Sequence, residues 1–405
     1  MMRGWVLLAV VACGCRNQDG EVAYLGSNTT TTVQGRRVAP SGASKDALFS
    51  LSALGWDLAT ASGLGKGEMN SAVSVVGFAQ SMALMANAAD GETRERLTEL
   101  LHVVPGELDA YNEAHASLLT ALHQEPSVTL ANSVWCVWPL PIRAEYSEVI
   151  APSYWAKVVN LGSAGQESVS QINTWSDKQT KGRFPRLFDV LDPQTAAVFC
   201  SAHAAIPAWD DPFPAPEPRG FRSSGREFEV ATLSDTRAYS GTMVKGVQFA
   251  VLASGSFEST FVLPRSGQSL DSLVAELSQD LAQEAEAAYR PQGGLIQFPQ
   301  LNLAVENSFD RTILAMRGGS VMRQPDLRYL SHELEGGFKI GVSQRVIVEL
   351  APGSGGTSSS QGEKSGTVTP ASADFVANRP FLVLIAYRYE GRKIPLIFAA
   401  INDPR

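Results

Sequence analysis

Apolar positions recur at helical spacing mainly in the first half of the chain. The spacing predicts helices over residues 47–61, 70–89, 111–122 and 169–179, and one more that follows Gly91-Glu92-Thr93 and runs to Leu101. The run over 70–89 is Ala-rich and almost without polar interruption. We expect that helix to be deeply buried, because a helix that is apolar on all sides needs protein around it.

β-Branched and aromatic runs become common further along. They predict strands over residues 128–138 and 197–205, over 243–263 with a turn at Gly255, and over 295–298, where Pro299 ends the run. A late helix is expected over 270–288. Helices thus dominate the N-terminal half and strands the C-terminal half, a pattern that predicts an α+β fold and not alternating βαβ units.

A long polar loop separates two apolar strands near the C-terminus. Residues 346–350 and 381–385 each read as a buried strand, and residues 351–374 between them are rich in Gly, Ser and Thr. Loops of this length inside a compact domain are uncommon and are usually functional or disordered. Which of the two applies decides what the protein does.

Composition places the chain among globular proteins. It has 405 residues, of which 44% are hydrophobic and 18% charged, with a net charge of -8 and a pI of about 5.3. There is no stripe of Lys and Arg, so we expect no nucleic-acid partner. Beyond the N-terminus no run of 18 or more apolar residues predicts a spanning helix.

The N-terminus has the pattern of an export signal. Arg3 supplies a positive charge and residues 5–11 a short apolar run. Val10-Val11-Ala12-Cys13 resembles the cleavage box of bacterial lipoproteins, in which the cysteine carries the lipid; Cys15 is a weaker candidate. The alternative is a plain secretory signal with incidental cysteines.

These features predict three regions. Residues 1–15 are the signal peptide, residues 16–45 a polar tether without apolar periodicity, and residues 46–405 a single domain. The expected location is the outer membrane or cell surface, facing the periplasm or the exterior, and Cys13 is the only expected membrane anchor.

Two cysteines remain in the domain. Cys136 and Cys200 each lie in an apolar, strand-like run. An exported protein can form disulfides, but two isolated cysteines do not establish that their side chains are close. We expect two buried free thiols, with a bridge as the alternative.

Enzyme and metal motifs are poorly represented. Residues 63–67 (Gly-Leu-Gly-Lys-Gly) lack the Ser or Thr that follows the lysine of a phosphate loop, and His332-Glu333 has no second histidine at the zincin spacing. There is no Gly-x-Ser-x-Gly elbow. We therefore expect no cofactor, no metal and no enzyme activity.

Segments spread along the chain form an ordered set of matches to one family. They are Asn70–Thr93, Leu130–Trp135, Ile172–Trp175, Thr180–Arg183, Leu191–Pro193, Trp209–Phe213, Phe375–Leu382 and Ile397–Pro404. This set resembles the serpin family of protease inhibitors, of the bacterial lipoprotein type, and covers nearly all of the chain from about Asp46. The resemblance implies the serpin fold, in which an exposed reactive loop, here about 351–374, adjoins a large central sheet.

The sequence departs from the family where the central sheet has to part. Of two serines expected there, Ser74 is kept and the other is Gly77. The strand before Trp209 has Ser201 to Ala205 in place of Asn-Ala-Ile/Leu-Tyr-Phe, and a His-Lys pair becomes Gln344-Arg345. The departures bear on loop insertion and not on the fold.

The resemblance implies a suicide-substrate inhibitor. A serine endopeptidase, or as a second class a cysteine endopeptidase, attacks the loop, and the freed loop enters the sheet as a new strand before the acyl-enzyme hydrolyses. The expected partner is one target protease, and the protein is expected to be a monomer. The alternative is a non-inhibitory serpin-fold protein that binds or scaffolds at the cell surface.

Alternation along the loop predicts which residues would enter the core. One face of an inserted strand must be small and uncharged. The odd-numbered set includes Gln361 and Glu363, so the even-numbered set must face inward: Ser354, Gly356, Ser358, Ser360, Gly362, Lys364 and Gly366. Lys364, near the far end, is the only member of this set that does not meet the requirement. This parity aligns Gly353 with the glycine that opens the serpin hinge. Pro352, just before it, restricts the backbone.

Counting along the loop predicts the reactive bond. Counting forward from Gly353 at the family spacing gives Thr367, and counting back from Arg379-Pro380-Phe381 gives Thr369. Pro370 follows Thr369, which favours Thr367-Val368 or Val368-Thr369. These small side chains suit an elastase-like or subtilisin-like target, and Lys364 lies too early to be the main site.

Overall fold

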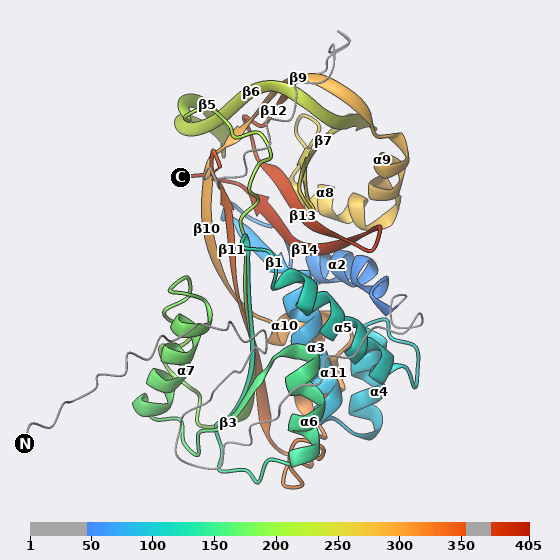
Figure 1. Cartoon of the computed structure of the whole chain (residues 1–405), viewed down its shortest axis with the longest axis vertical. Helices are drawn as coiled ribbons and strands as arrows, with labels where there is room; N and C mark the ends of the chain where they lie inside the picture. Colours follow the sequence, from blue (N-terminus) through green and yellow to red (C-terminus); the bar gives the residue numbers. More distant parts are fainter. Residues whose placement is uncertain (1–46, 354–373) are drawn as a thin grey trace, which may run out of the picture.

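The computed structural model describes residues 47–353 and 374–405, apart from the side chain of Gln279. Two sheets and a set of helices share one main hydrophobic core (Figure 1). The helices are α2 Ser50–Ala61, α3 Val75–Ala88, α4 Gly91–Leu100, α5 Leu108–Leu122, α6 Ala144–Tyr154, α7 Gln166–Gln179, α8 Leu270–Glu276, α9 Ala282–Ala288, α10 Asp310–Ala315 and α11 Gly319–Arg323, with a π-helical turn, Leu277–Leu281, between α8 and α9.

A five-stranded sheet runs along the length of the molecule. Its order is β10 (Leu301–Ser308), β11 (Lys339–Leu350), β4 (Thr195–Ala205), β2 (Val128–Cys136) and β3 (Lys157–Asn160). Helix α7 lies on one face of this sheet, and α3 with its neighbouring helices lies on the other (Figure 1).

A nine-stranded sheet lies mainly in the upper half of the molecule as drawn in Figure 1. Its order is β1 (Ser71–Ser74), β14 (Arg392–Ile401), β13 (Phe381–Tyr389), β8 (Phe257–Leu263), β7 (Val247–Ser254), β6 (Arg226–Val244), β9 (Arg290–Pro299) and β12 (Phe375–Val376), and β5 (Glu217–Ser223) also pairs with β6. The α+β fold expected from the sequence is confirmed.

The predicted helix over 70–89 has the wrong start. Residues 71–74 form β1, with Ser71 opposite Ala400 of β14, and the helix begins only at Val75. Ser74 ends the strand and caps the helix, because its Oγ accepts a hydrogen bond from Gly77 N at 3.0 Å. The rest of α3 is buried on nearly all sides, as its composition predicts.

The other predicted elements overlap observed ones of the same type, with different bounds: the helix predicted from residue 47 begins at Ser50, and the run over 243–263 is divided among β6, β7 and β8. The predicted strand at 295–298 is the C-terminal part of β9, and the strand at 128–138 ends at Cys136. The helix over 270–288 is interrupted by the π-helical turn. In every helix of the described ranges the length and apolarity fall short of what a bilayer span requires.

Cys136 and Cys200 are buried and free, which confirms the prediction of two free thiols. They lie on adjacent strands, but Cys136 is opposite Ala197 and Cys200 is opposite Ser133. Cys136 belongs to the main core and Cys200 to the smaller core under α7. Burial raises the pKa of the Cys136 thiol to about 12 and that of Cys200 further, so both are inert thiols.

Candidate functional site

Two parallel strands, β4 and β11, meet in the middle of the five-stranded sheet. Their register runs from Lys339 opposite Thr195 to Val348 opposite Ala205, and we call this contact the seam. Each strand has an antiparallel neighbour on its other side, β2 for β4 and β10 for β11. A strand formed by the chain turning back after β11 would run antiparallel to both sides of the seam, and antiparallel pairing is slightly more stable per residue.

A buried polar cluster closes the seam on its inner face. Gln344 of β11 accepts a hydrogen bond from Ser74 N at 2.8 Å and donates to Ser74 O at 2.9 Å and Ser201 Oγ at 3.4 Å. Gln344 and Ser201 are direct partners in the ladder. With His203, these residues form what we call the seam cluster, and each is at most 2% exposed. The structure therefore brings together Ser74, Ser201 and Gln344 of the predicted sheet-opening residues.

His203 is the member of the seam cluster whose role the sequence did not predict. Its Nδ1 lies 2.6 Å from Ser74 Oγ, which also accepts from Gly77 N and lies 3.2 Å from Leu396 O. The serine has one proton, so both contacts are satisfied only if His203 donates from Nδ1 and Ser74 donates to Leu396 O. Nε2 then carries no proton and has no partner. Burial lowers the pKa of His203 from 6.5 to about 3, so the ring is neutral.

Gly77 belongs to the same site because no larger residue fits there. A Cβ at this position would lie 2.9 Å from Gln344 Nε2, 3.0 Å from Ser201 Oγ and 3.1 Å from Ser74 Oγ. The space that the family gives to a second serine is thus filled by the side chains of Gln344 and Ser201. Glycine in place of the family's second serine at position 77 thus leaves room for Gln344, which itself replaces the family's histidine.

Trp209 lies apart from the seam cluster, at the end of β11. Its Nε1 donates to Ala351 O at 2.7 Å, and Phe213 N donates to Pro352 O, also at 2.7 Å. Gly353 follows with φ +107, a value that favours glycine, and a Cβ there would lie 3.3 Å from Pro212 Cβ. The two bonds extend the seam past its last ladder pair and fix the beginning of the loop.

The far end of the loop is fixed to the other sheet. Asp374 Oδ1 accepts from Leu295 N at 3.0 Å, and Gln248 Nε2 donates to Asp374 O at 2.7 Å. Strand β12 then pairs with β9, with Phe375 opposite Ile296. The loop therefore connects the two sheets, and each of its ends is held by hydrogen bonds.

Arg345 crosses the outer face of the seam. Its Nη2 donates to Leu187 O at 3.2 Å and pairs with Glu306 at 2.7 Å. Leu187 follows α7 and donates its own N–H to Asn173 Oδ1 of that helix at 2.7 Å. The segment that contains Leu187 packs on β4. Arg345 therefore connects this segment, on the β4 side of the seam, to β11 on the other side.

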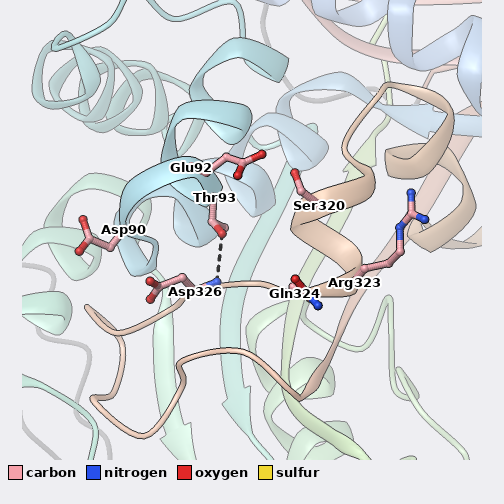
Figure 2. Close-up of a pocket in the computed structure, with 7 residues that line it drawn as sticks. All are labelled: Asp90, Glu92, Thr93, Ser320, Arg323, Gln324 and Asp326. Atoms are coloured by element: carbon pink, nitrogen blue, oxygen red, sulfur yellow. Dashed lines mark hydrogen bonds between the residues drawn. The ribbon is translucent and has the colours of Figure 1, made fainter.

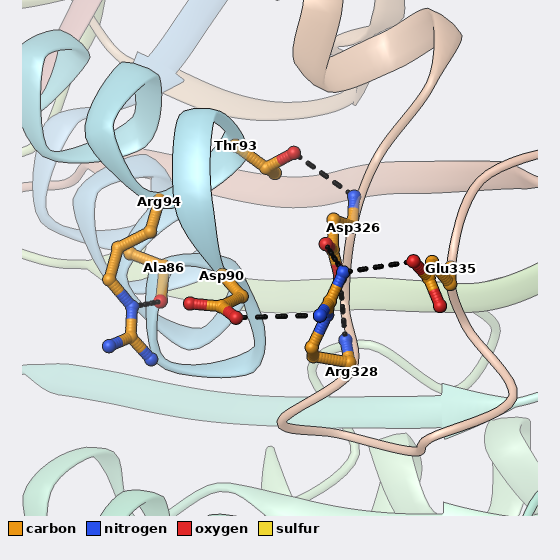
Figure 3. A network of polar contacts seen from close by, with 7 residues as sticks. All are labelled: Ala86, Asp90, Thr93, Arg94, Asp326, Arg328 and Glu335. Atoms are coloured by element: carbon orange, nitrogen blue, oxygen red, sulfur yellow. Dashed lines mark hydrogen bonds and ion pairs between the residues drawn. The ribbon is translucent and has the colours of Figure 1, made fainter.

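The turn between α3 and α4 and the segment after α11 carry a charged network (Figure 3). Thr93 Oγ1 accepts from Asp326 N at 3.0 Å. The Arg328 guanidinium lies 2.6 Å from Asp326, 3.1 Å from Glu335 and 3.7 Å from Asp90. Arg328 is 40% exposed, and exposed pairs contribute little stability, so the network mainly fixes the turn after α3 to the segment that leads to β11.

An open hollow of about 460 Å³ lies beside this network (Figure 2). It is lined by Asp90, Glu92, Thr93, Ser320, Arg323, Gln324 and Asp326. The lining contains no histidine or cysteine, and the Asp326 carboxylate is already paired with Arg328.

Several predicted site residues lie outside the described residues. They are Cys13 of the lipid anchor, Ser354, Gly356, Ser358 and Ser360 of the hinge, and Thr367, Val368 and Thr369 at the reactive bond. Gly353 is described and is the last residue before the gap. The site known in structure is the seam and the two ends of the loop.

Comparison with known proteins gives a family that matches this geometry. The model of the family described as "Serpin (serine protease inhibitor)" matches residues 50–404. Bovine alpha-2-antiplasmin (Bos taurus) is 22% identical over 348 residues, which is 83% of this chain and 68% of that protein. A rice protein (Oryza sativa subsp. japonica) whose name includes "non-inhibitory serpin-10" is 24% identical over 192 residues, 46% of this chain and 48% of its own.

Solved structures show the same fold. The native state of tengpin, a thermophilic serpin, matches with a TM-score of 0.79 at 17% identity, covering 92% of this chain and 97% of its own. Serpins as a family are protease inhibitors and not enzymes. The family model spans nearly the whole domain, and the chain belongs to the serpin family.

Proposed function

We propose that this serpin is a suicide-substrate inhibitor of serine endopeptidases, which inserts the residues after Gly353 into the seam once the loop is cleaved. The observation that carries the proposal is the parallel β4–β11 pair, from whose end the loop begins. Insertion would replace one parallel pair by two antiparallel pairs. Residues 354–365 have the same length as the 12-residue strand β11.

The burial pattern of β11 supports the predicted inward face of the loop. Its even-numbered residues, Ile340 to Leu350, are buried, while the odd-numbered ones are more exposed. If residues 351–353 form a three-residue turn with a glycine of positive φ, Ser354 comes to lie opposite Leu350. Directly opposite residues of an antiparallel pair share one face. The even-numbered residues of the loop, which are all small except Lys364, would then face the main core.

A non-inhibitory serpin is the second candidate, and one observation favours it. The bonds from Trp209 and Phe213 hold Ala351 and Pro352, and the seam cluster joins both strands below them. These bonds have to break for insertion, and Pro352 restricts the turn that follows. The similar rice protein carries the words "non-inhibitory" in its name. In this case the loop would be cleaved without trapping the protease.

The small side chains around the predicted reactive bond suggest an elastase-like or subtilisin-like target. Thr367, Val368 and Thr369 would fill a shallow apolar pocket but leave the acidic pocket of a trypsin-like enzyme without a partner. Sequencing the peptide released on cleavage identifies the bond. A new N-terminus at Val368 or Thr369 agrees with the proposal, and one elsewhere rejects the assignment of the bond.

A denaturing gel separates inhibitor from substrate. The protein is mixed with an elastase-like protease, and the same protease with its catalytic serine chemically blocked serves as control. An inhibitor gives a band of higher mass that withstands boiling in detergent, and only with the active enzyme. Cleaved protein without that band, at every protease ratio tested, contradicts the inhibitory function and supports the second candidate.

We also propose that Cys13 carries lipid, that residues 16–45 tether the domain, and that the inhibitor acts at the cell surface. The support is the apolar run that ends at Ala12-Cys13 and the polar stretch after it. Mass spectrometry of the mature N-terminus should find an acylated Cys13. An unmodified N-terminus further along the chain would reject the anchor.

A further inference from the structure

Arg237 of β6 directs its side-chain bonds to the segment that holds the beginning of the loop. Its Nη1 donates to Asp211 O at 2.7 Å and its Nη2 to Pro212 O at 3.4 Å. The guanidinium lies over the Phe213 ring, 3.6 Å from its centroid, and pairs with Asp235 at 2.6 Å. The side chain is only 10% exposed. A planar fork that stacks on a ring and bonds two carbonyls at once is a geometry that lysine cannot reproduce.

The segment held by Arg237 is the one that bonds the hinge. Phe213 N and Trp209 Nε1 reach Pro352 O and Ala351 O, each at 2.7 Å. Phe213 is also fixed by aromatic packing, with its ring centroid 5.5 Å from Trp209 and 5.1 Å from Phe298. Moving residues 211–213 would therefore remove the donor from Pro352 O and disturb the second bond.

Both ends of the loop are anchored at one point of the nine-stranded sheet. Arg237 lies opposite Gly294 in the β6–β9 ladder. The next residue, Leu295, donates its N–H to Asp374 Oδ1 at the far end of the loop. Arg237, which holds the segment bonded to the hinge, therefore lies beside Leu295, which holds the far end of the loop at Asp374. The two anchors share a rigid framework, although the loop leaves from one sheet and returns to the other.

We propose that Arg237 is a positioning residue for loop insertion: it fixes residues 211–213 so that Phe213 and Trp209 hold Pro352 and Ala351, and thereby sets the rate at which the seam opens. The consequence for insertion rests on the proposed function, whereas the contacts themselves do not. Without Arg237 the upper end of the seam opens more often. The residues after Gly353, or a peptide of that sequence, then enter sooner.

The first test follows backbone hydrogen exchange in the peptides that span residues 209–213 and 346–353. Arg237→Gln should speed exchange in both, roughly tenfold for Phe213, the scale expected when a charge-assisted bond is lost. Arg219→Gln is the matched control, since Arg219 also pairs at 2.6 Å with a carboxylate two residues earlier, Glu217, but lies on β5 away from the hinge. Exchange at the parent rate in Arg237→Gln overturns the proposal.

The second test adds a synthetic peptide with the sequence of residues 353–366 and follows its incorporation by native gel. Arg237→Gln should take up the peptide several times faster than the parent, Arg237→Lys should lie in between, and Arg219→Gln should match the parent. A purely structural role would lower the melting midpoint without changing the uptake rate, and that result overturns the proposal. Should Arg237→Gln fail to fold, Asp235→Asn removes only the orienting carboxylate, and unchanged exchange in that variant counts equally against it.

The two readouts keep this inference separate from the proposed function. If the protein never traps a protease and no variant takes up peptide, faster exchange at Phe213 in Arg237→Gln still supports the role of Arg237 in fixing residues 211–213, while the inhibitory function fails. If a covalent complex forms but exchange and uptake do not respond to Arg237, the inhibitory function stands and the role of Arg237 is rejected.

Discussion

Ser74 is bonded to both sides of the seam at once. Its backbone pairs with Gln344 of β11, and its hydroxyl meets His203 of β4. Each such bond contributes about 0.5–1.5 kcal/mol net, but a buried polar group left without a partner costs about 1–3 kcal/mol. His203 already has one unpartnered nitrogen. A few hydrogen bonds therefore hold the seam closed, and the loss of any one of them would lower the free energy of unfolding. The unpartnered Nε2 of His203 already lowers it.

The neutrality of His203 makes stability depend on pH. Burial lowers its pKa, and that of His115, from 6.5 to about 3. Above pH 6.5 neither the folded nor the unfolded state is protonated, so the stability is fully present; below it only the unfolded state gains protons, and stability falls until the pH approaches 3. In this range each of the two histidines lowers the free energy of unfolding by about 1.4 kcal/mol for every unit by which the pH falls.

His203→Gln should remove about half of the pH dependence that His203 and His115 together cause, so its unfolding free energy should fall less steeply than the parent's between pH 6.5 and 5. Urea unfolding at several pH values measures this. His115→Gln should reduce the slope by a similar amount, and the double variant by both amounts. A His203→Gln protein with the parent's slope would show that His203 is not buried in its neutral form.

Gly77→Ala should destabilise the protein by about 1–2 kcal/mol, although alanine is the better helix former. The added Cβ would meet Gln344 Nε2 at 2.9 Å and displace the amide from its partners. Urea unfolding compares the single variants Gly77→Ala and Gln344→Ala with the double variant. If the amide is the obstacle, the double variant loses less than the sum of the two. Additive losses would place the clash elsewhere.

At the scale of elements, periodicity predicted the type of most long segments but missed their boundaries. The run over 70–89 is apolar throughout, and periodicity cannot separate a buried strand from a buried helix in such a run. Strand β1 exists because Ser71–Ser74 pairs with β14 at the other end of the chain. Strands β6 and β10 and helix α6 were not predicted either, since their apolar positions are interrupted by polar ones.

The candidate site was predictable only in part, for a related reason. Family resemblance pointed to Ser74, Gly77, Ser201 and Gln344, and these meet in space. The bond from Trp209 to Ala351 and the role of Arg237 join residues far apart in sequence. The local sequence pattern does not predict such contacts, because they depend on how the two sheets are placed against each other.

The inserted strand can be tested by placing one charge on either face of it. Gly356→Glu puts a carboxylate on the face predicted to enter the core, where burying an unpaired charge costs several kcal/mol. Cleavage by the target protease should continue while the covalent complex disappears on a denaturing gel. Gly355→Glu is the matched control, with the same change on the opposite face, and should retain most of the complex. The reverse ranking would show that the odd-numbered residues enter the core.

At the scale of the whole molecule, the loop is a connection under constraint. It leaves the five-stranded sheet at Leu350 and returns to the nine-stranded sheet at Phe375. While the chain is intact, the residues after Gly353 cannot fill the seam along its whole length and still reach Asp374. Under the proposed inhibitory function, cleavage removes that constraint, and the loop would then add to the seam as a strand with two antiparallel pairs.

The melting midpoint before and after cleavage of the loop tests this account most directly. The protein is nicked between Lys364 and Pro370, the cut is located by mass, and both forms are heated under identical conditions. The account predicts that the nicked form melts higher, by roughly 10 °C or more. Since each kcal/mol shifts the midpoint of a large domain by about 2–4 °C, this rise corresponds to about 2.5–5 kcal/mol of stability gained by insertion. A midpoint that is unchanged or lower after nicking would show that the loop does not enter the seam.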